Sequence, residues 1–500
     1  MPFIKALGAL NKDCKFFLHF GLCFRHNVYI GIMSYTRYKK FGRKEYAYEI
    51  TSYWDSKRKK PRQKVKYLGV VDHEGKIVEK KTFAHHERLI LDFGDTYLLY
   101  EFMKATNIAH MIEDVFGGEA KKLLCLLCYR ICHGSAMSYA KLWYEGNVCR
   151  LLFPGIDISS QRISDLLCMI GEEQLQRTFF SRYLSSLKDI GGGVIIDTTA
   201  LPNQVRLPFN AWGYHDGAIE KQIRFLFVID KDTSSPLFFR YLPGNIVDVS
   251  PLSVTMEELA QLGIRHGFVL IDAGFFSEDN VRELYGKKID FLSRLPSSRT
   301  LYKELIKKDS RTLERFTHAV RYGKRVLFIR RTQINLYGKR GYAYLVLDPE
   351  RKGREIRKLL TNALDGNTED IEYRVMKQGI MILISSLKID TKDIVPWYYL
   401  RQTVEMLFGF SKDDLKLIPL RIHKEETLRG YLLLMFIALV VFLRLKKAIG
   451  DEHTVEEILF AMRNVKCKVY EHELLIQELT KQQKDIVDIL HVLVPKKLGI

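Results

Sequence analysis

The sequence predicts an α/β protein in which a mixed β-sheet is flanked by helices. Between residues 191 and 295, apolar runs and helical stretches follow in the order strand, strand, strand, helix, strand, helix, strand. Residues 95–190 are helical in pattern, because apolar side chains recur at intervals of three and four. Residues 296–392 are again rich in strand-like runs and are basic. With 47% apolar residues, the 500-residue chain can form packed cores in several domains.

The chain is strongly basic, with 78 Lys and Arg against 59 Asp and Glu, a net charge of +19 and a pI of about 9.3. This excess favours a polyanionic partner, most often nucleic acid and less often an acidic membrane surface. The longest apolar run, Tyr431–Leu443, is shorter than the ~20 residues of a bilayer span. We therefore expect a buried helix there and no membrane partner.

The eight cysteines are scattered, which favours free thiols and a reducing, cytoplasmic compartment. Cys125, Cys128, Cys132 and His133 suggest zinc, but no second Cys/His pair follows at finger spacing. The three cysteines share one face of a predicted helix, so a buried helix face is the favoured interpretation. Charged residues such as Lys12 and Asp13 interrupt the N-terminal apolar pieces, so no secretory signal is expected.

The first 94 residues divide into two parts. Residues 1–32 differ in sequence character from the residues that follow Met33. We expect translation to start naturally at Met33, and residues 1–32 to be a non-native or disordered extension. From Arg37 to Lys66, twelve Lys and Arg face three acidic residues, with aromatic residues interleaved. Tyr46–Tyr53 and Gln63–Val71 alternate as strands do. A small basic β-rich DNA-contacting module is favoured over a solvated basic loop.

The pattern of the remaining chain predicts further elements. We expect a hairpin of Ile223–Asp230 with Pro236–Tyr241, and helices at Leu252–Leu262 and Glu278–Tyr285. The other expected elements are strands and one buried helix: Val194–Thr199, Phe268–Asp272, Ile289–Leu292, Arg325–Arg331, Tyr342–Leu347, Ile380–Ser386 and the helix Leu428–Leu445.

The most informative stretch is a helical stripe that begins at Tyr398. Tyr398, Arg401, Glu405 and Lys412 have the spacing Y-x2-R-x3-E-x6-K. At about 100° per residue, all four side chains fall within an arc of about 60°. A helix face with one carboxylate, two cations and a phenol is suited to binding a phosphodiester beside a metal ion. Glu405 by itself, however, would be an ordinary ion-pair partner for Arg401.

Two aspartates follow apolar runs: Asp197 after Val194–Ile196, and Asp272 after Phe268–Ile271. Each is expected at a strand end, although a lone aspartate there is usually a turn or cap. With Glu405 they would form a three-carboxylate set that repels itself unless a cation neutralises it. Mg²⁺ or Mn²⁺ does this well, and two such ions can act on both sides of a phosphorus atom. Asp230 fits hairpin turn chemistry better, and Asp248 a turn or supporting role.

Taken together, these residues resemble the bacterial DDE insertion-sequence transposases with the Y-(2)-R-(3)-E-(6)-K signature. Ile195–Ala200 and Leu270–Phe276 are similar to the two aspartate strands of that family, and Pro243–Asp248 to a segment between them. The similarity extends from about Met33 to Leu445.

The resemblance implies a ribonuclease-H-like catalytic core with a β-rich insertion before the glutamate. It implies that Asp197, Asp272 and Glu405 are catalytic and bind two Mg²⁺ ions, with Mn²⁺ as a substitute. It also implies that Tyr398, Arg401 and Lys412 contact DNA. The expected division is 1–32 extension, 33–94 β-rich module, 95–190 helical domain, 191–295 first part of the core, 296–392 insertion, 393–450 second part with the signature helix and 451–500 helical tail.

The implied activity is metal-dependent hydrolysis at transposon ends, followed by transfer of the 3′-hydroxyl into target DNA. Expected partners are duplex DNA, as terminal inverted repeats and target, and a second copy in a homodimer on DNA. The expected location is the bacterial cytoplasm, at the nucleoid. Relatives that form DNA hairpins use a tryptophan in the insertion, and none lies between Pro296 and Pro396. The alternatives are an inactive or domesticated DNA-binding protein and a ribonuclease-H-like nuclease without strand transfer.

Overall fold

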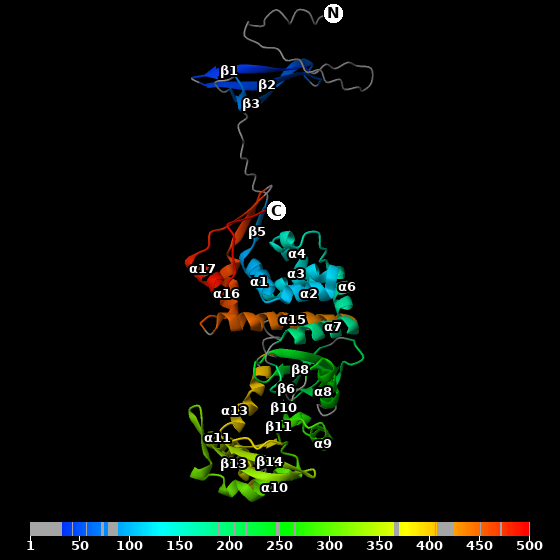
Figure 1. The fold of residues 1–500 in the computed structure, drawn as a ribbon, viewed down its shortest axis with the longest axis vertical. Helices are drawn as coiled ribbons and strands as arrows, with labels where there is room; N and C mark the ends of the chain where they lie inside the picture. Colours follow the sequence, from blue (N-terminus) through cyan, green and yellow to red (C-terminus); the bar gives the residue numbers. More distant parts are fainter. Residues whose placement is uncertain are drawn as a thin grey trace, which may run out of the picture. The chain divides into compact units, whose positions relative to one another are not determined.

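The computed structural model divides the chain into two compact units, residues 1–86 and 87–500 (Figure 1). It describes residues 33–499 apart from short gaps, so the predicted extension at residues 1–32 lies outside the described residues. The gaps are 43, 57, 72–74, 79–88, 188–189, 204–205, 216–217, 247–250, 265–266, 365–369, 406, 408–421, 423, 451 and 471–472.

The first unit is an antiparallel sheet in the order β1-β2-β3-β4. Its strands are β1 Met33–Phe41, β2 Lys44–Asp55, β3 Lys60–Val71 and β4 Ile77–Val78. The two predicted strands are confirmed, and each is longer than predicted. The connecting turn is correspondingly short, because pairing continues to Asp55 opposite Lys60.

The second unit begins with a short strand and a layer of helices, as the three-and-four spacing predicts. The elements are β5 Leu89–Asp92, α1 Gly94–Ala105, α2 Ile108–Phe116, α3 Ala120–Cys132, α4 Ala140–Glu145, α5 Cys149–Leu152, α6 Ser160–Ile170 and α7 Glu173–Ser186. Cys125, Cys128 and Cys132 are buried free thiols on α3, so the buried-face interpretation is confirmed.

A ten-stranded mixed sheet forms the centre of this unit. Its first part comprises β6 Val194–Pro202, β7 Ala211–His215, β8 Ala218–Asp230, β9 Pro236–Pro243, β10 Phe268–Ile271 and β11 Asp290–Arg294, with helices α8 Pro251–Gln261 and α9 Glu278–Gly286. β6, β8 and β9 are antiparallel neighbours, whereas β10 is parallel to β6 and β11 is parallel to β10. This mixed order, with a helix before each parallel strand, is that of a ribonuclease-H-like core.

The insertion extends the same sheet instead of forming a separate one. β12 Ala319–Tyr322, β13 Arg325–Leu336, β14 Lys339–Leu347 and β15 Ile380–Ser385 add to the sheet, because β15 pairs antiparallel with β11. The region also contains three helices, α10 Thr300–Asp309, α11 Pro349–Leu364 and α12 Ile371–Met376, which the β-rich prediction omitted. In α11, Lys, Arg, Glu and Leu favour the helix strongly.

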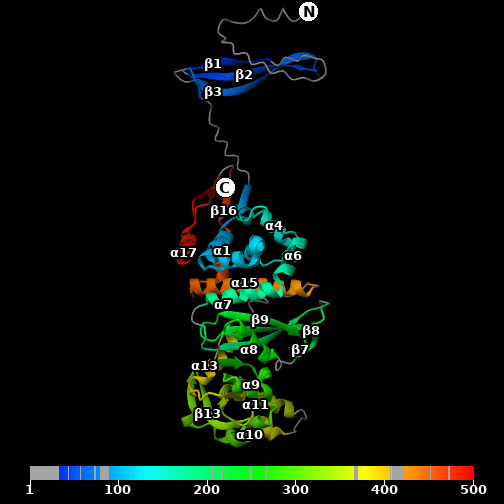
Figure 2. The same cartoon turned by 45° about the vertical axis from the view of Figure 1, so that its right-hand side comes forward.

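The predicted buried helix is α15, Glu425–Ile449, and it lies between the helical layer and the sheet (Figures 1 and 2). Its Phe436 contacts aromatic rings on both sides, including Phe180 of α7 and Phe239 of β9. Among the described residues, no helix is long and apolar enough to cross a membrane. From Gly430 to Phe442 every residue of α15 is buried, so this part of the helix can be apolar on all sides.

The C-terminal region is not wholly helical, which corrects the predicted tail. Helices α16 Val455–Arg463 and α17 Lys481–Ile489 are accompanied by strands β16 Lys466–Val469, β17 Glu473–Ile476 and β18 Lys497–Gly499. β16 pairs with β5, which lies more than 370 positions earlier. Short strands of this kind depend on a distant partner, so local periodicity misses them. The remaining domain boundaries stay a prediction.

Two glycines allow α6 and α15 to cross at close range. A Cβ atom on Gly430 would lie 1.8 Å from the carbonyl oxygen of Leu167, and one on Gly171 would lie 1.8 Å from that of Glu426. Backbone carbonyls cannot rotate away as flexible side chains do, so only a residue without a Cβ fits at either position.

We predict that Gly430→Ala destabilises the protein by ~1–3 kcal/mol or more, because α6 and α15 must move apart to accommodate the added Cβ atom. Gly353→Ala on α11 is the matched control, since nothing lies within 4 Å of its Cβ position. It should stabilise the protein by about 0.5–1 kcal/mol, because glycine is a poor helix former. Urea unfolding measures both, and equal effects of the two substitutions would contradict the close crossing.

Candidate active site

The parallel pairing of β6 and β10 brings the two predicted aspartates side by side. Ile271 pairs with Ile196, so Asp272 and Asp197, each the next residue, lie level on neighbouring strands. Asp272 follows β10 directly, as predicted. Asp197 does not end its strand, because β6 continues to Pro202 in pairing with β8. Its backbone is therefore held by pairing with Phe227 of β8.

The signature stretch approaches these aspartates from a helix that is interrupted once. α13 spans Ile394–Tyr399, Leu400 forms a tight turn, and residues 401–405 are again helical. At the turn the Leu400 N–H donates to the carbonyls of both Pro396 and Trp397, at 3.2 Å each. Tyr398, Arg401 and Glu405 still share one side, and all three reach the aspartate cluster.

Arg401 joins the three carboxylates. Its Nη1 donates to Asp197 Oδ2 at 2.9 Å and lies 3.7 Å from Asp272 Oδ1. Its Nη2 donates to Glu405 Oε1 at 2.8 Å. Tyr398 completes the cluster by donating its hydroxyl to Asp272 Oδ1 at 3.3 Å. The structure thus brings together five of the six predicted site residues.

The sixth, Lys412, lies outside the described residues, as does Asp248. Asp230 acts in a turn, as predicted. Its Oδ1 accepts from the backbone N–H groups of Asp232 and Thr233 at 3.1 and 2.7 Å, which closes the β8–β9 hairpin.

The carboxylates differ in exposure and therefore in electrostatics. The Asp197 side chain is 7% exposed, that of Asp272 34% and that of Glu405 51%, so the cluster opens to solvent on the Glu405 side. Burial raises the pKa of Asp197 to about 7, although the adjacent Arg401 lowers it. The charges of Asp272 and Glu405 add to the rise.

Burial has the opposite effect on the pKa of Arg401, the cationic partner of Asp197. Burial by itself lowers the pKa of Arg401, but Asp197 and the other acidic groups outweigh it and raise that pKa above its ordinary value. The pKa of Tyr398 is raised to about 12, first by burial and then by the charge of Asp272. Near neutral pH the phenol and the guanidinium therefore keep their protons and act as donors.

The donor set fits a hard divalent cation, because it consists of carboxylate oxygens at the mouth of a solvent-facing cluster. Asp197, Asp272 and Glu405 all lie within reach of one guanidinium, which supplies the positive charge between them. In this arrangement, no group of three acidic, His or Cys side chains among the described residues has the spacing of a metal site.

Sequence reasoning missed Arg294, the last residue of β11. Ser293 pairs with Ile271, so Arg294 lies level with Asp272 on the next strand. It is exposed, and its charge lowers the pKa of Tyr398 against the effect of burial. A basic residue directly after the predicted strand Ile289–Leu292 is the sequence signal that points to it.

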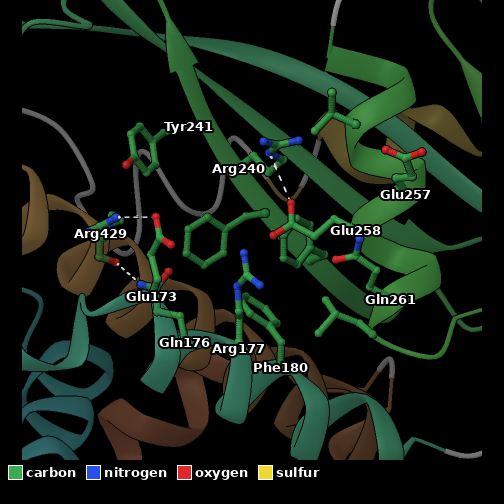
Figure 3. A pocket seen from close by; sticks show the side chains of 14 residues that line it. Glu173, Gln176, Arg177, Phe180, Arg240, Tyr241, Glu257, Glu258, Gln261 and Arg429 are labelled. Carbon is green, nitrogen blue, oxygen red and sulfur yellow. Dashed lines mark hydrogen bonds and ion pairs between the residues drawn. The ribbon is translucent and has the colours of Figure 1, made fainter.

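A cavity of about 400 Å³ lies elsewhere, among α7, β9, α8 and the start of α15 (Figure 3). Its charged residues are largely paired: Arg429 with Glu173 at 3.2 Å, and Arg240 with Glu258 at 3.6 Å. None of the predicted site residues lines it, so we do not associate it with the carboxylate cluster.

The raised pKa of Asp197 predicts a pH-dependent stability in metal-free protein. A free aspartate has a pKa of about 3.9, so between ~pH 4 and ~pH 7 the folded state binds more protons than the unfolded state. Asp197 therefore costs stability as pH rises through this window. Asp197→Asn should gain relative to wild type over the same window, by up to ~1.4 kcal/mol per pH unit.

Urea unfolding across this pH range measures the difference. Asp165→Asn is the control for loss of an exposed carboxylate, since the Asp165 side chain is 46% exposed. If the advantage of Asp197→Asn did not grow with pH, the assigned effect of burial would be wrong.

The sequence was compared with known proteins. A family model described as "Transposase DDE domain" matches residues 190–441, just over half of the 500-residue chain. No curated protein matches the chain in sequence. Among solved structures, the chain is similar to a piggyBac transposase in a synaptic complex with hairpin DNA, with 12% identity and a TM-score of 0.37 over 79% of this chain and 70% of that one. The matched residues contain the whole carboxylate cluster, and the chain belongs to the family of DDE transposases.

Proposed function

We propose that the chain is a transposase that hydrolyses phosphodiesters at transposon ends and transfers the 3′-hydroxyl into target DNA. The observation that carries this proposal is the convergence of Asp197, Asp272 and Glu405 on Arg401. These carboxylates come from two strands and one helix of a DDE domain, and an ordinary surface salt bridge needs no such assembly.

The three carboxylates would hold two Mg²⁺ ions, with Mn²⁺ as a substitute. Divalent ions bound there would activate the attacking oxygen and stabilise the leaving oxygen at phosphorus. Asp197 would provide a rigid ligand because its backbone lies within a continuous strand and pairs with Phe227 of β8. Glu405 provides an adjustable one because it is half-exposed on a helix.

The remaining residues of the cluster would bind the DNA backbone. The planar guanidinium of Arg401 suits two phosphate oxygens at once. Tyr398 keeps its proton at neutral pH and can donate to a third. Lys412 would add a further phosphate contact from the same stripe of the signature sequence.

The proposed substrates are duplex DNA with terminal inverted repeats and duplex target DNA. Two ends must be held together for transposition, so we expect a homodimer on DNA. The proposed location is the bacterial cytoplasm, at the nucleoid. A strand-transfer assay with pre-cleaved ends tests the second step, and cleavage without transfer would instead identify a nuclease.

We predict that Asp197→Ala, Asp272→Ala and Glu405→Ala each reduce Mg²⁺-dependent cleavage by at least about a hundredfold while DNA binding survives. Glu278→Ala is the matched control, because Glu278 forms an ion pair with an arginine four positions away, Arg282, as Glu405 does with Arg401. Cleavage is measured on end-labelled duplex, and binding on the same duplex without metal. A variant with near-normal cleavage would refute the role of that carboxylate.

Arg401→Ala gives a second readout that does not depend on cleavage. It leaves three carboxylates without their shared cation, so metal-free protein should lose about 3–5 kcal/mol of stability. Added Mg²⁺ should restore stability more in this variant than in wild type, because it replaces the lost charge. Arg162→Ala, which breaks an exposed pair with Asp165, should cost at most ~1 kcal/mol and show no added Mg²⁺ effect. Equal Mg²⁺ shifts in thermal unfolding for all three proteins would contradict a metal site here.

A further inference from the structure

The hairpin of β2 and β3 extends beyond the rest of its sheet. β1 pairs with β2 only as far as Ser52, whereas β2 and β3 pair on to Asp55 opposite Lys60. The outer edge of β3 meets β4 only at Val70 and Val71. Among the described residues, the rest of that edge has no strand partner, so one side of the hairpin is open along most of its length.

Four cations lie in a row on this open strand: Lys60, Arg62, Lys64 and Lys66. Alternate residues of a strand point to the same face, and they recur about every 6.8 Å. All four are exposed. The residues between them on β3 carry no charge, so the cations occupy one face of the strand.

The positive charge of this row is poorly compensated. Residues 58–66 contain six Lys and Arg and no acidic residue. Asp55 lies 3.7 Å from Arg62, and Glu49 pairs in register with Lys66. An ion pair of an exposed cation such as Arg62, whose side chain is 43% exposed, is weak, at most ~1 kcal/mol, so the cation can exchange this partner for a phosphate.

Two simpler explanations fit less well. Lysines on an open strand also prevent pairing with other chains, but here the basic run continues through Arg58 and Lys59 in the turn, beyond the strand. A platform for stacked bases would need free aromatic rings among the cations. Tyr46, Tyr48 and Tyr67 pack against one another, and Tyr67 points to the opposite face from Lys64 and Lys66. Tyr53 of β2 is exposed opposite Arg62, but one ring offers a single stacking position and not a platform for successive bases.

We propose that the cation row of β3, with the turn that precedes it, binds the sugar–phosphate backbone of duplex DNA. This inference rests on the proposed function, in which duplex DNA is the substrate, and assigns part of its binding to a surface outside the carboxylate cluster. Each cation that contacts a phosphate releases counterions, so binding through this row must be steeply salt-dependent. Contacts with phosphates do not depend on the bases, so the row should bind duplex DNA of any sequence.

The test uses the full-length protein, in which Lys60, Arg62, Lys64 and Lys66 are all changed to Gln. Binding to a labelled linear duplex is measured without metal at several salt concentrations by fluorescence anisotropy. The plot of log K against log salt should become less steep by about 0.9 for each phosphate that the variant no longer neutralises, or about 3–4 in total. At fixed low salt the affinity should fall on the order of tenfold or more.

The matched control removes four other exposed cations, Lys446, Lys447, Lys481 and Lys484, each changed to Gln. It lowers the net charge equally and should leave the slope nearly unchanged. A variant with Lys60, Lys64 and Lys66 changed to Arg should keep the wild-type slope, which separates loss of charge from loss of folding.

The outcomes separate this inference from the proposed function. A fourfold Gln variant with the wild-type slope, in a protein whose wild type binds and cleaves duplex, would overturn the inference alone. A variant that loses affinity for single-stranded DNA but not for duplex would also overturn it. A wild-type protein that binds no duplex at all would overturn both.

Discussion

The arrangement of the carboxylate cluster depends on one electrostatic constraint, which is that three carboxylates share a single guanidinium. Asp197 is nearly buried, and burial opposes its charge, so an aspartate held there needs a cation beside it. Arg401 meets that need and reaches Asp272 and Glu405 as well. The helix that carries Arg401 is thereby fixed against the edges of β6 and β10. Under the proposed function, a divalent ion among the same oxygens would supply the same positive charge.

The rest of the second unit holds this cluster in place. α15 lies between the helical layer and the sheet, and Phe436 contacts rings from both. Its crossing with α6 is close enough that Gly171 and Gly430 meet carbonyl oxygens of the opposite helix. The sheet beneath it continues through β15 into the insertion, so the segment between the second aspartate and the glutamate is continuous with the catalytic sheet.

Local patterns predicted most of the elements and failed where partners lie far away in sequence. The strands that carry Asp197 and Asp272 were predictable, because consecutive apolar residues before an acid leave little ambiguity. The strands Lys466–Val469 and Glu473–Ile476 were missed because each is only four residues long. Lys466–Val469 is held by pairing with the distant Leu89–Asp92, and Glu473–Ile476 pairs with Lys466–Val469. The helices of the insertion were missed because strand-like runs on both sides dominated its pattern. Arg294 was missed because a basic residue after a strand is a weak signal, which gains significance only when the neighbouring strand is known to carry Asp272.

The sequence by itself determined which residues have the chemistry: a tyrosine, an arginine and a glutamate on one helical stripe, and two aspartates after apolar runs. Spacing along a helix is a local property, so the stripe could be derived from residues 398–412 alone. Only the tertiary structure decided that Asp197 and Asp272 lie level on neighbouring parallel strands and that Arg401 reaches both. Parallel strands are joined by long crossovers, and their register depends on how the whole sheet packs. The burial that raises the pKa of Asp197 likewise belongs to the folded core and to no segment of the sequence.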